Sequence, residues 1–243
     1  NLLRYQVTAP VTDAPKSAKG SVAAALVSNS GTIEAAGGRV VMTSRAAKNI
    51  QDNVINNTGM VEATSISAHN GEIDLDAGPN GTVDVRGTLD ASGAASGQTG
   101  GTVKVTGGTV AVKSGANIDA SGDAGGGTVL LGGGAHGKGS LAHARRTRIG
   151  DATITADATT NGNGGKIVIW SDSHTSLDGT LSARGGANGG NGGFVETSGH
   201  TLGISRSSRV DAGAKIGLVG DWLIDPTDLL ITSNTSQPAC CST

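Results

Sequence analysis

The sequence predicts an all-β protein, a right-handed parallel β-helix with three short strands per turn and about seven turns. Three observations predict it: a three-residue unit, apolar-x-Ala, recurs seven times; Gly-rich segments separate short alternating runs of Val, Ile and Thr; and aromatic residues make up only 2% of the chain. The apolar residues of the seven units, which we call rung positions, are Ile33, Val61, Leu89, Ile118, Ile154, Leu181 and Val210.

The spacing of the rung positions favours a solenoid over other all-β folds. Successive central residues of the unit are separated by 28, 28, 29, 36, 27 and 29 residues. A repeat of this length marks a chain in which each unit buries its apolar face by stacking on the next. The alternative is an antiparallel sandwich or barrel. Such a fold would show hairpin signals every 8–12 residues and no repeat of about 28 residues.

Composition narrows the class of protein. The net charge is −2 and few aromatic residues are present, so neither a positive field nor a stacking platform for nucleic acid is expected. Small β-branched residues in thin layers must fill the core in place of aromatic ones. The sequence contains no run of 18 apolar residues, so no membrane-spanning helix is expected. Cys240 and Cys241 are adjacent near the end of the chain, cannot staple the core, and leave the redox compartment open.

Three regions are expected along the chain. Residues 1–30, with Pro10 and Pro15, form a lead-in coil or strands that continue an upstream domain. Residues 31–231 form the β-helix, and residues 232–243 form a polar C-terminal linker or tail. Near 45–55, the spacing of apolar residues fits one face of a short helix or, alternatively, an irregular loop.

The segment from Gly87 to Gly122 shows the unit most clearly. Residues 88–91, 102–106 and 109–112 alternate between apolar and polar side chains, and glycines bound each run. Three short strands therefore fit into each turn. A strand paired with its counterpart one turn away gives a parallel sheet, and the crossover rule favours the right-handed coil.

Four segments resemble filamentous-haemagglutinin-type exoproteins: residues 31–43 (GTIEAAGGRVVMT), 119–127 (DASGDAGGG), 164–170 (GGKIVIW) and 222–228 (WLIDPTD). The resemblance extends over most of residues 20–231. It implies a segment of a secreted bacterial surface adhesin, exported through an outer-membrane transporter partner by two-partner secretion. The Asn-Pro-Asn-Gly-type motif of the family's secretion domain is absent, so the resemblance implies the β-helical region that follows that domain.

Acidic residues occupy the centre of the first four units, at Glu34, Glu62, Asp90 and Asp119. Stacked at about 4.8 Å, such charges repel by only about 1 kcal/mol in water, so a solvated face can carry them. The alternative is a polysaccharide-cleaving β-helix, in which paired carboxylates act as acid and base. Thr155 and Ser182 interrupt the series, which favours the solvated face, and no enzyme activity is expected.

The interval of 36 residues coincides with a glycine-rich insertion at 132–148. This insertion contains no acidic residue and carries four positive charges, at Lys138, Arg145, Arg146 and Arg148. Insertions in solenoids emerge as loops at one corner and often bind partners. Arginine suits sulfate and carboxylate groups, so an acidic host-surface or matrix glycan, or a protein, is a candidate partner. The alternative is a solvated loop whose arginines lie over acidic rungs.

Several individual residues are also candidate functional sites. Alternation points Trp170 outward, where it either stacks on a sugar ring or covers a corner of the helix. The five histidines lack metal-ligand spacing, and no Gly-Gly-x-Gly-x-Asp calcium repeat occurs, so neither a metal site nor a cofactor is expected. Trp222, Asp225 and Pro226 are expected to cap the last turn, because proline removes a donor; cleavage at the Asp-Pro bond is the alternative.

The predicted function is therefore that of a structural shaft segment of a secreted adhesin at the bacterial cell surface. Two alternatives stay open at this stage. One is a carbohydrate-active β-helix enzyme, and the other is a haem- or host-protein-capturing exoprotein of the same family.

Overall fold

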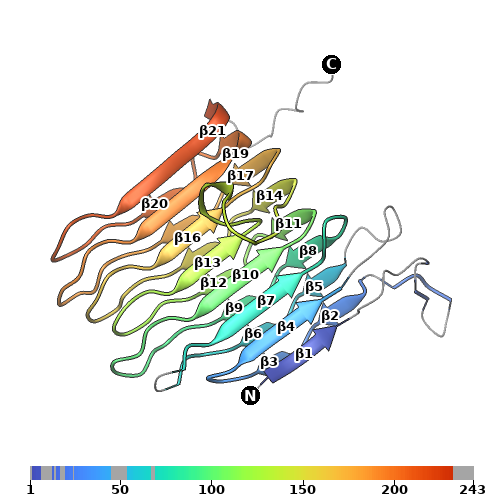
Figure 1. Cartoon of the computed structure of the whole chain (residues 1–243), viewed down its shortest axis with the longest axis horizontal. Helices are drawn as coiled ribbons and strands as arrows, with labels where there is room; N and C mark the ends of the chain where they lie inside the picture. The colour runs from blue at the N-terminus through green and yellow to red at the C-terminus, as the bar shows by residue number, and fades with distance from the viewer. Residues whose placement is uncertain are drawn as a thin grey trace.

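The structure, a computed structural model, describes residues 2–6, 13, 15–16, 20–23, 25–44, 54–66 and 69–231. It is a parallel β-solenoid of about seven turns with three strands per turn, as the repeat predicts. Figure 1 shows the coils side by side from β1 at one end to β21 at the other. The one helical element among the described residues is a 3-10 turn, η1 (Ala135–Gly137).

The strands form three columns, in each of which a strand pairs in parallel with its counterpart in the next coil. Column one holds β1 (Leu2–Gln6), β4 (Arg39–Thr43), β7 (Glu72–Asp76), β10 (Thr102–Thr106), β13 (Thr128–Leu131) and β16 (Lys166–Ile169). Column two holds β2 (Val27–Asn29), β5 (Ile55–Asn57), β8 (Thr82–Val85), β11 (Thr109–Val112), β14 (Arg146–Ile149) and β17 (His174–Leu177).

The third column is a separate seven-stranded sheet and contains the seven rung positions in register. Its strands are β3 (Thr32–Glu34), β6 (Met60–Glu62), β9 (Thr88–Asp90), β12 (Asn117–Asp119), β15 (Thr153–Thr155), β18 (Thr180–Ser182) and β20 (Arg209–Asp211). Each rung residue pairs with the next, from Ile33 and Val61 through to Leu181 and Val210.

Two long strands join the first two columns at the C-terminal end. Both β19 (Phe194–Ile204) and β21 (Asp221–Ile231) continue from column one into column two. The expected stop at Pro226 does not occur, because β21 runs through it and pairs with β19 on both sides. Pro226 lies opposite Gly199, between the segments that belong to the two columns.

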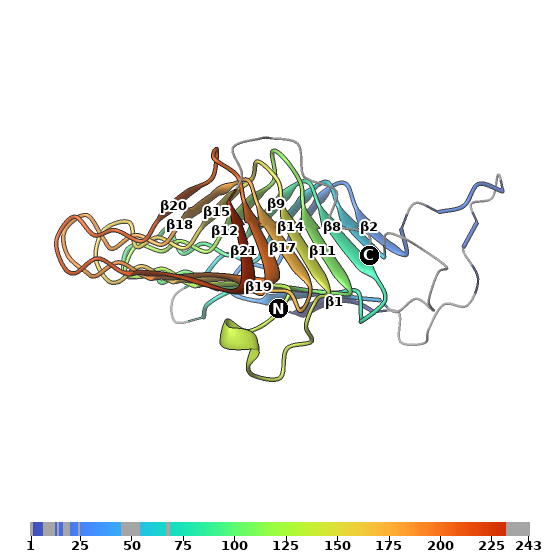
Figure 2. The ribbon, with the colours of Figure 1, turned by 90° about the horizontal axis from the view of Figure 1, so that it is seen from above.

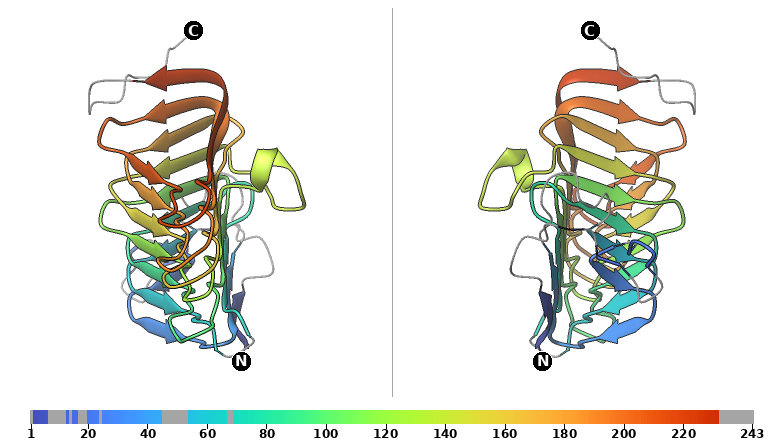
Figure 3. Two further views of the ribbon diagram at one scale, coloured as in Figure 1. Left: turned by 90° about the vertical axis from the view of Figure 1, so that its left-hand side faces the viewer. Right: turned by 90° about the vertical axis from the view of Figure 1, so that its right-hand side faces the viewer.

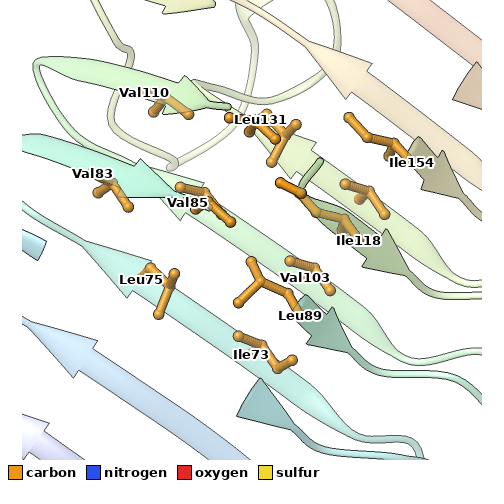
Figure 4. Close-up of a cluster of buried hydrophobic side chains, with 14 of the residues drawn as sticks. Ile73, Leu75, Val83, Val85, Leu89, Val103, Val110, Ile118, Leu131 and Ile154 are labelled. Carbon is orange, nitrogen blue, oxygen red and sulfur yellow. The ribbon is translucent and has the colours of Figure 1, made fainter. Parts of the chain in front are cut away.

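The core is a thin line of small apolar side chains that point inward from all three columns (Figure 4). Leu89, Ile118 and Ile154 of column three are fully buried, as are Ile73 and Val103 of column one. Full burial of such a side chain stabilises the fold by roughly 1.5–3 kcal/mol. Because each layer recurs in the next coil, the stack has a continuous core without needing large aromatic residues.

The Gly-Gly pairs of the sequence have a steric cause in the stack. Gly127 donates its backbone N–H to the carbonyl of Ala120, the alanine of the preceding unit, at 2.7 Å. A Cβ on the neighbouring Gly126 would overlap the carbonyl oxygen of Ala156 in the next coil. The same contact recurs at Gly164 with Ala183, so the alanine of each unit and the Gly-Gly pair form one corner.

Two further expectations from the sequence are the helix near residues 45–55 and the boundary at residue 31. The short helix expected near 45–55 falls on residues 45–53, outside the described residues, and β5 begins at Ile55. The predicted boundary at residue 31 stays a prediction. Strands β1 and β2 lie within the lead-in segment and pair with β4 and β5.

Candidate binding surface

The insertion of the fourth interval is a loop outside the solenoid. It leaves column one after β13 and returns at β14, so it comprises residues 132–145. Figures 2 and 3 show it projecting from the wall formed by column one, with η1 at its outer part. We call residues 132–145 the outer loop.

A buried carboxylate fastens the outer loop to the solenoid. Both oxygens of Glu196 on β19 accept the backbone N–H of His136, at 2.9 and 3.1 Å. The Ser198 hydroxyl donates to the same carboxylate at 3.0 Å, and Glu196 is fully buried. Sequence reasoning missed Glu196, because an acid at an outward strand position is expected to face solvent and no pattern shows that a loop covers it.

Trp170 packs under the outer loop. A Cβ on Gly133 would lie 2.7 Å from Trp170 Cδ1, and one on Gly137 would also collide with the indole. The indole Nε1 donates to Asp172 Oδ1 at 3.2 Å, and His143 Nδ1 lies 3.0 Å from the same oxygen. The structure therefore places Trp170 beneath the outer loop, and its role in binding a sugar stays a prediction.

The four basic residues lie in different parts of the structure. Lys138 and Arg145 belong to the outer loop, whereas Arg146 and Arg148 lie on β14 in column two. Alternation explains the difference, since Thr147 and Ile149 point inward and the two arginines point outward. All four are exposed, and none has an ion-pair partner among the described residues.

His174 lies beside these arginines, because β17 pairs Arg146 with His174 and Arg148 with Ser176. Burial lowers the pKa of His174, and the positive charges of Arg148 and Arg146 lower it further. Neither ring nitrogen has a hydrogen-bond partner within the described residues. Arg145, Arg146, Arg148 and His174 form what we call the basic strip.

The acidic rungs make local hydrogen bonds. Glu34, Glu62, Asp90 and Asp119 stack in register on the outward side of column three. The carboxylates of Asp90 and Asp119 each accept the backbone N–H two residues further on, at 2.8 Å. Thr155 continues the series and donates to Asp119 Oδ1 at 2.8 Å. These carboxylates cap the turns that follow the rungs.

Two further properties concern the described residues only. They contain no group of three or more His, Cys, Asp or Glu side chains arranged to hold a metal ion. Among them, no helix is long and apolar enough to cross a membrane.

Comparison with known proteins assigns the family. No family model and no curated protein matches the chain. A solved structure does match: "Crystal structure of the HMW1 secretion domain from Haemophilus influenzae", with 33% sequence identity and a TM-score of 0.67. The chain is a β-helix of the filamentous-haemagglutinin type.

The match covers 82% of this filamentous-haemagglutinin-type chain and 49% of the solved chain, so the chain spans about half of the length of that neighbour. The neighbour's title describes a secretion domain. Our placement of the chain after such a domain, rather than within it, stays a prediction.

Proposed function

We propose that the chain is a stiff shaft segment of a bacterial adhesin that is secreted by two-partner secretion and displayed at the cell surface. The observation that carries this proposal is the unbroken register of the rung positions over seven coils. Contacts in such a stack are local and length grows with each coil, which suits a rod that holds other parts away from the cell. The similarity to the HMW1 secretion domain supports it.

We further propose that the basic strip contacts an acidic glycan of a host surface or matrix, with Lys138 adding charge from the outer loop. Arg146 and Arg148 are exposed, lack acidic partners among the described residues and project from the same face of one strand. Each guanidinium group can donate two parallel hydrogen bonds to one sulfate or carboxylate group.

Binding to heparin, with neutral dextran as the control glycan, tests this role. Replacing Arg145, Arg146 and Arg148 with Ser should weaken heparin binding roughly tenfold or more, because each charge-assisted contact contributes on the order of 1 kcal/mol. A triple Ser variant at Arg86, Arg184 and Arg206 removes the same charge elsewhere and should bind like the wild type. Unchanged binding by the first variant contradicts the proposal.

The enzyme alternative is tested on the same samples. Release of reducing sugar from an acidic polysaccharide would support a carbohydrate-active β-helix and contradict a purely structural shaft. Capture of haem or a host protein in a parallel binding assay would favour the other exoprotein class of this family.

A second candidate function is recognition by the outer-membrane transporter partner. The observation that favours it is the match to a structure whose title names a secretion domain. Co-purification of the chain with the transporter's periplasmic part would support this function, and its absence at high protein concentration would count against it.

A further inference from the structure

His174 lies within the basic strip, and its imidazole is unpaired. Its strand, β17, pairs in parallel with β14 on one side and with β19 on the other, so that Arg146 and Thr201 are its neighbours in register. The backbone N–H of His174 donates to the carbonyl of Arg145 at 3.3 Å. Both ring nitrogens are buried, and neither has a hydrogen-bond partner among the described residues. The strands therefore position the ring without any polar contact to its nitrogens.

The imidazole lies on the outward side of column two, as do the two arginines of β14. Thr175 and Leu177, which alternate with His174 along β17, are buried on the core side. His174 and Arg146 are thus neighbours on one face of the sheet, in which adjacent strands lie about 4.8 Å apart. At this separation a proton on the imidazole is repelled by the guanidinium charge.

The charged side chains around His174 are mostly basic. The titratable and charged groups on the elements packed against it are Arg146 and Arg148 on β14, Arg145 and His143 on the outer loop, His200 on β19, and Asp172 in the segment before β17. Asp172 is already engaged, because its Oδ1 accepts from Trp170 Nε1 at 3.2 Å and lies 3.0 Å from His143 Nδ1. Within the described part of the chain, no carboxylate contacts the imidazole of His174.

Two causes hold the pKa of His174 below its ordinary value. Burial of the ring is the larger one, and the charges of Arg148 and Arg146 add to it. The two causes respond differently to a bound anion. Burial is a property of the fold, whereas the repulsion disappears when a sulfate or carboxylate group neutralises the guanidinium groups. An anion on the basic strip therefore raises the pKa of His174 towards its ordinary value of about 6.5.

We propose that binding of an acidic glycan to the basic strip is coupled to proton uptake by His174, so that the strip holds its ligand more tightly at mildly acidic pH. This coupling rests on the proposed glycan-binding function of the strip and adds a regulation to it. Linkage makes the coupling reciprocal: a ligand that promotes protonation is itself bound more tightly when the proton is present. The protonated imidazole also offers both ring nitrogens as N–H donors to sulfate or carboxylate oxygens.

The direction of the pH dependence follows from the two pKa values of His174. Well above both, the imidazole is neutral with and without ligand, and affinity does not change with pH. Between the lower value of the free protein and the higher value of the complex, only the complex takes up the proton, so affinity rises as pH falls. Below both, affinity is constant again and is about tenfold higher for a pKa difference of one unit.

Heparin binding measured at about pH 7.5 and about pH 5.5, at one ionic strength, tests the proposal. The wild type should bind roughly threefold or more tightly at the lower pH. His174→Gln should bind like the wild type at the higher pH and lose this increase, because an amide takes up no proton. The control His69→Gln, which removes an exposed histidine between β6 and β7, should keep the increase.

Proton NMR of the imidazole C–H signals is an independent measurement on the wild type. The signal that is missing from His174→Gln belongs to His174, and its titration midpoint should move to higher pH when a heparin oligosaccharide is added. Circular dichroism checks that the variant keeps its β-structure, and His174→Asn replaces it if it does not.

The outcomes separate this coupling from the function on which it rests. Heparin binding that is equal at the two pH values, an increase that survives in His174→Gln, or an unchanged titration midpoint would each overturn the coupling and leave the proposed glycan binding intact. A wild type that binds heparin at neither pH would overturn the glycan-binding function and the coupling with it.

Discussion

The Glu196 carboxylate accepts the backbone N–H of His136 at 2.9 and 3.1 Å, across a separation of 60 residues. This contact fastens the outer loop over β16 and β19. It also explains why an acid is fully buried without a cation, since a neutral backbone donor and the Ser198 hydroxyl satisfy it.

Replacing Glu196 with Ala should release the outer loop. The substitution leaves the His136 N–H without its acceptor, which we expect to cost about 1–3 kcal/mol. The released loop should then be cleaved faster by trypsin after the exposed residues Lys138 and Arg145. Limited proteolysis and urea unfolding measure the two effects. Glu62→Ala, at an outward acid that makes only a 3.5 Å side-chain contact, is the control. Equal cleavage of both variants would show that Glu196 does not hold the loop.

Gly133→Ala should displace Trp170. The added Cβ would lie 2.7 Å from Trp170 Cδ1, so the indole or the loop must move. In a Trp222→Phe background, we expect red-shifted emission and stronger quenching by iodide, because the ring gains contact with water. Gly203→Ala adds a Cβ with no atom within 4 Å and should leave the spectrum unchanged. A Gly133 variant with a wild-type spectrum would contradict this packing.

Ile118→Ala should destabilise the stack more than Ile33→Ala. Ile118 is fully buried between coils on both sides, whereas Ile33 is a partly buried residue of the first coil. The central cavity should cost about 2–5 kcal/mol, and the terminal change should cost less because water already reaches that position. Urea unfolding of both variants measures the difference. Similar losses would mean that the end of the core is as closed as its middle.

Stability should depend on the protonation of His174. The fold holds the pKa of His174 below its ordinary value of about 6.5, so the unfolded chain binds the proton first as pH falls. Stability is therefore lost as pH falls through about 6.5 towards the lower folded value. Thermal unfolding of the wild type and His174→Gln at neutral and mildly acidic pH checks this. The wild type should lose more stability than the variant, and parallel losses would exclude His174 as the cause.

Repetition explains why the fold could be predicted. Each apolar-x-Ala unit alone is a weak signal, but seven of them at a regular spacing define the register of a whole column. The one long interval, of 36 residues, correctly located the insertion. The other coils are nearly equal in length, so the extra residues must project from the stack as a loop. The role of Pro226 was less predictable, since β21 continues through Pro226 and pairs with β19 on both sides of it.

The candidate binding surface was predictable only in part. The sequence marks the four positive charges, but alternation within β14, not the loop, sets the direction of Arg146 and Arg148. Neither the proximity of His174 nor the packing of Trp170 against Gly133 follows from spacing, because both depend on which coil lies beside which loop.

By itself, the sequence determined the parallel β-helix, its rung residues and the coil that carries the insertion, because these depend on local alternation repeated at a fixed period. Only the tertiary structure decided that the outer loop lies on column one, that Glu196 is buried beneath it, and that His174 lies beside Arg146. The physical reason is that these features arise from contacts between coils and between a coil and the loop, which no periodic pattern in the chain records.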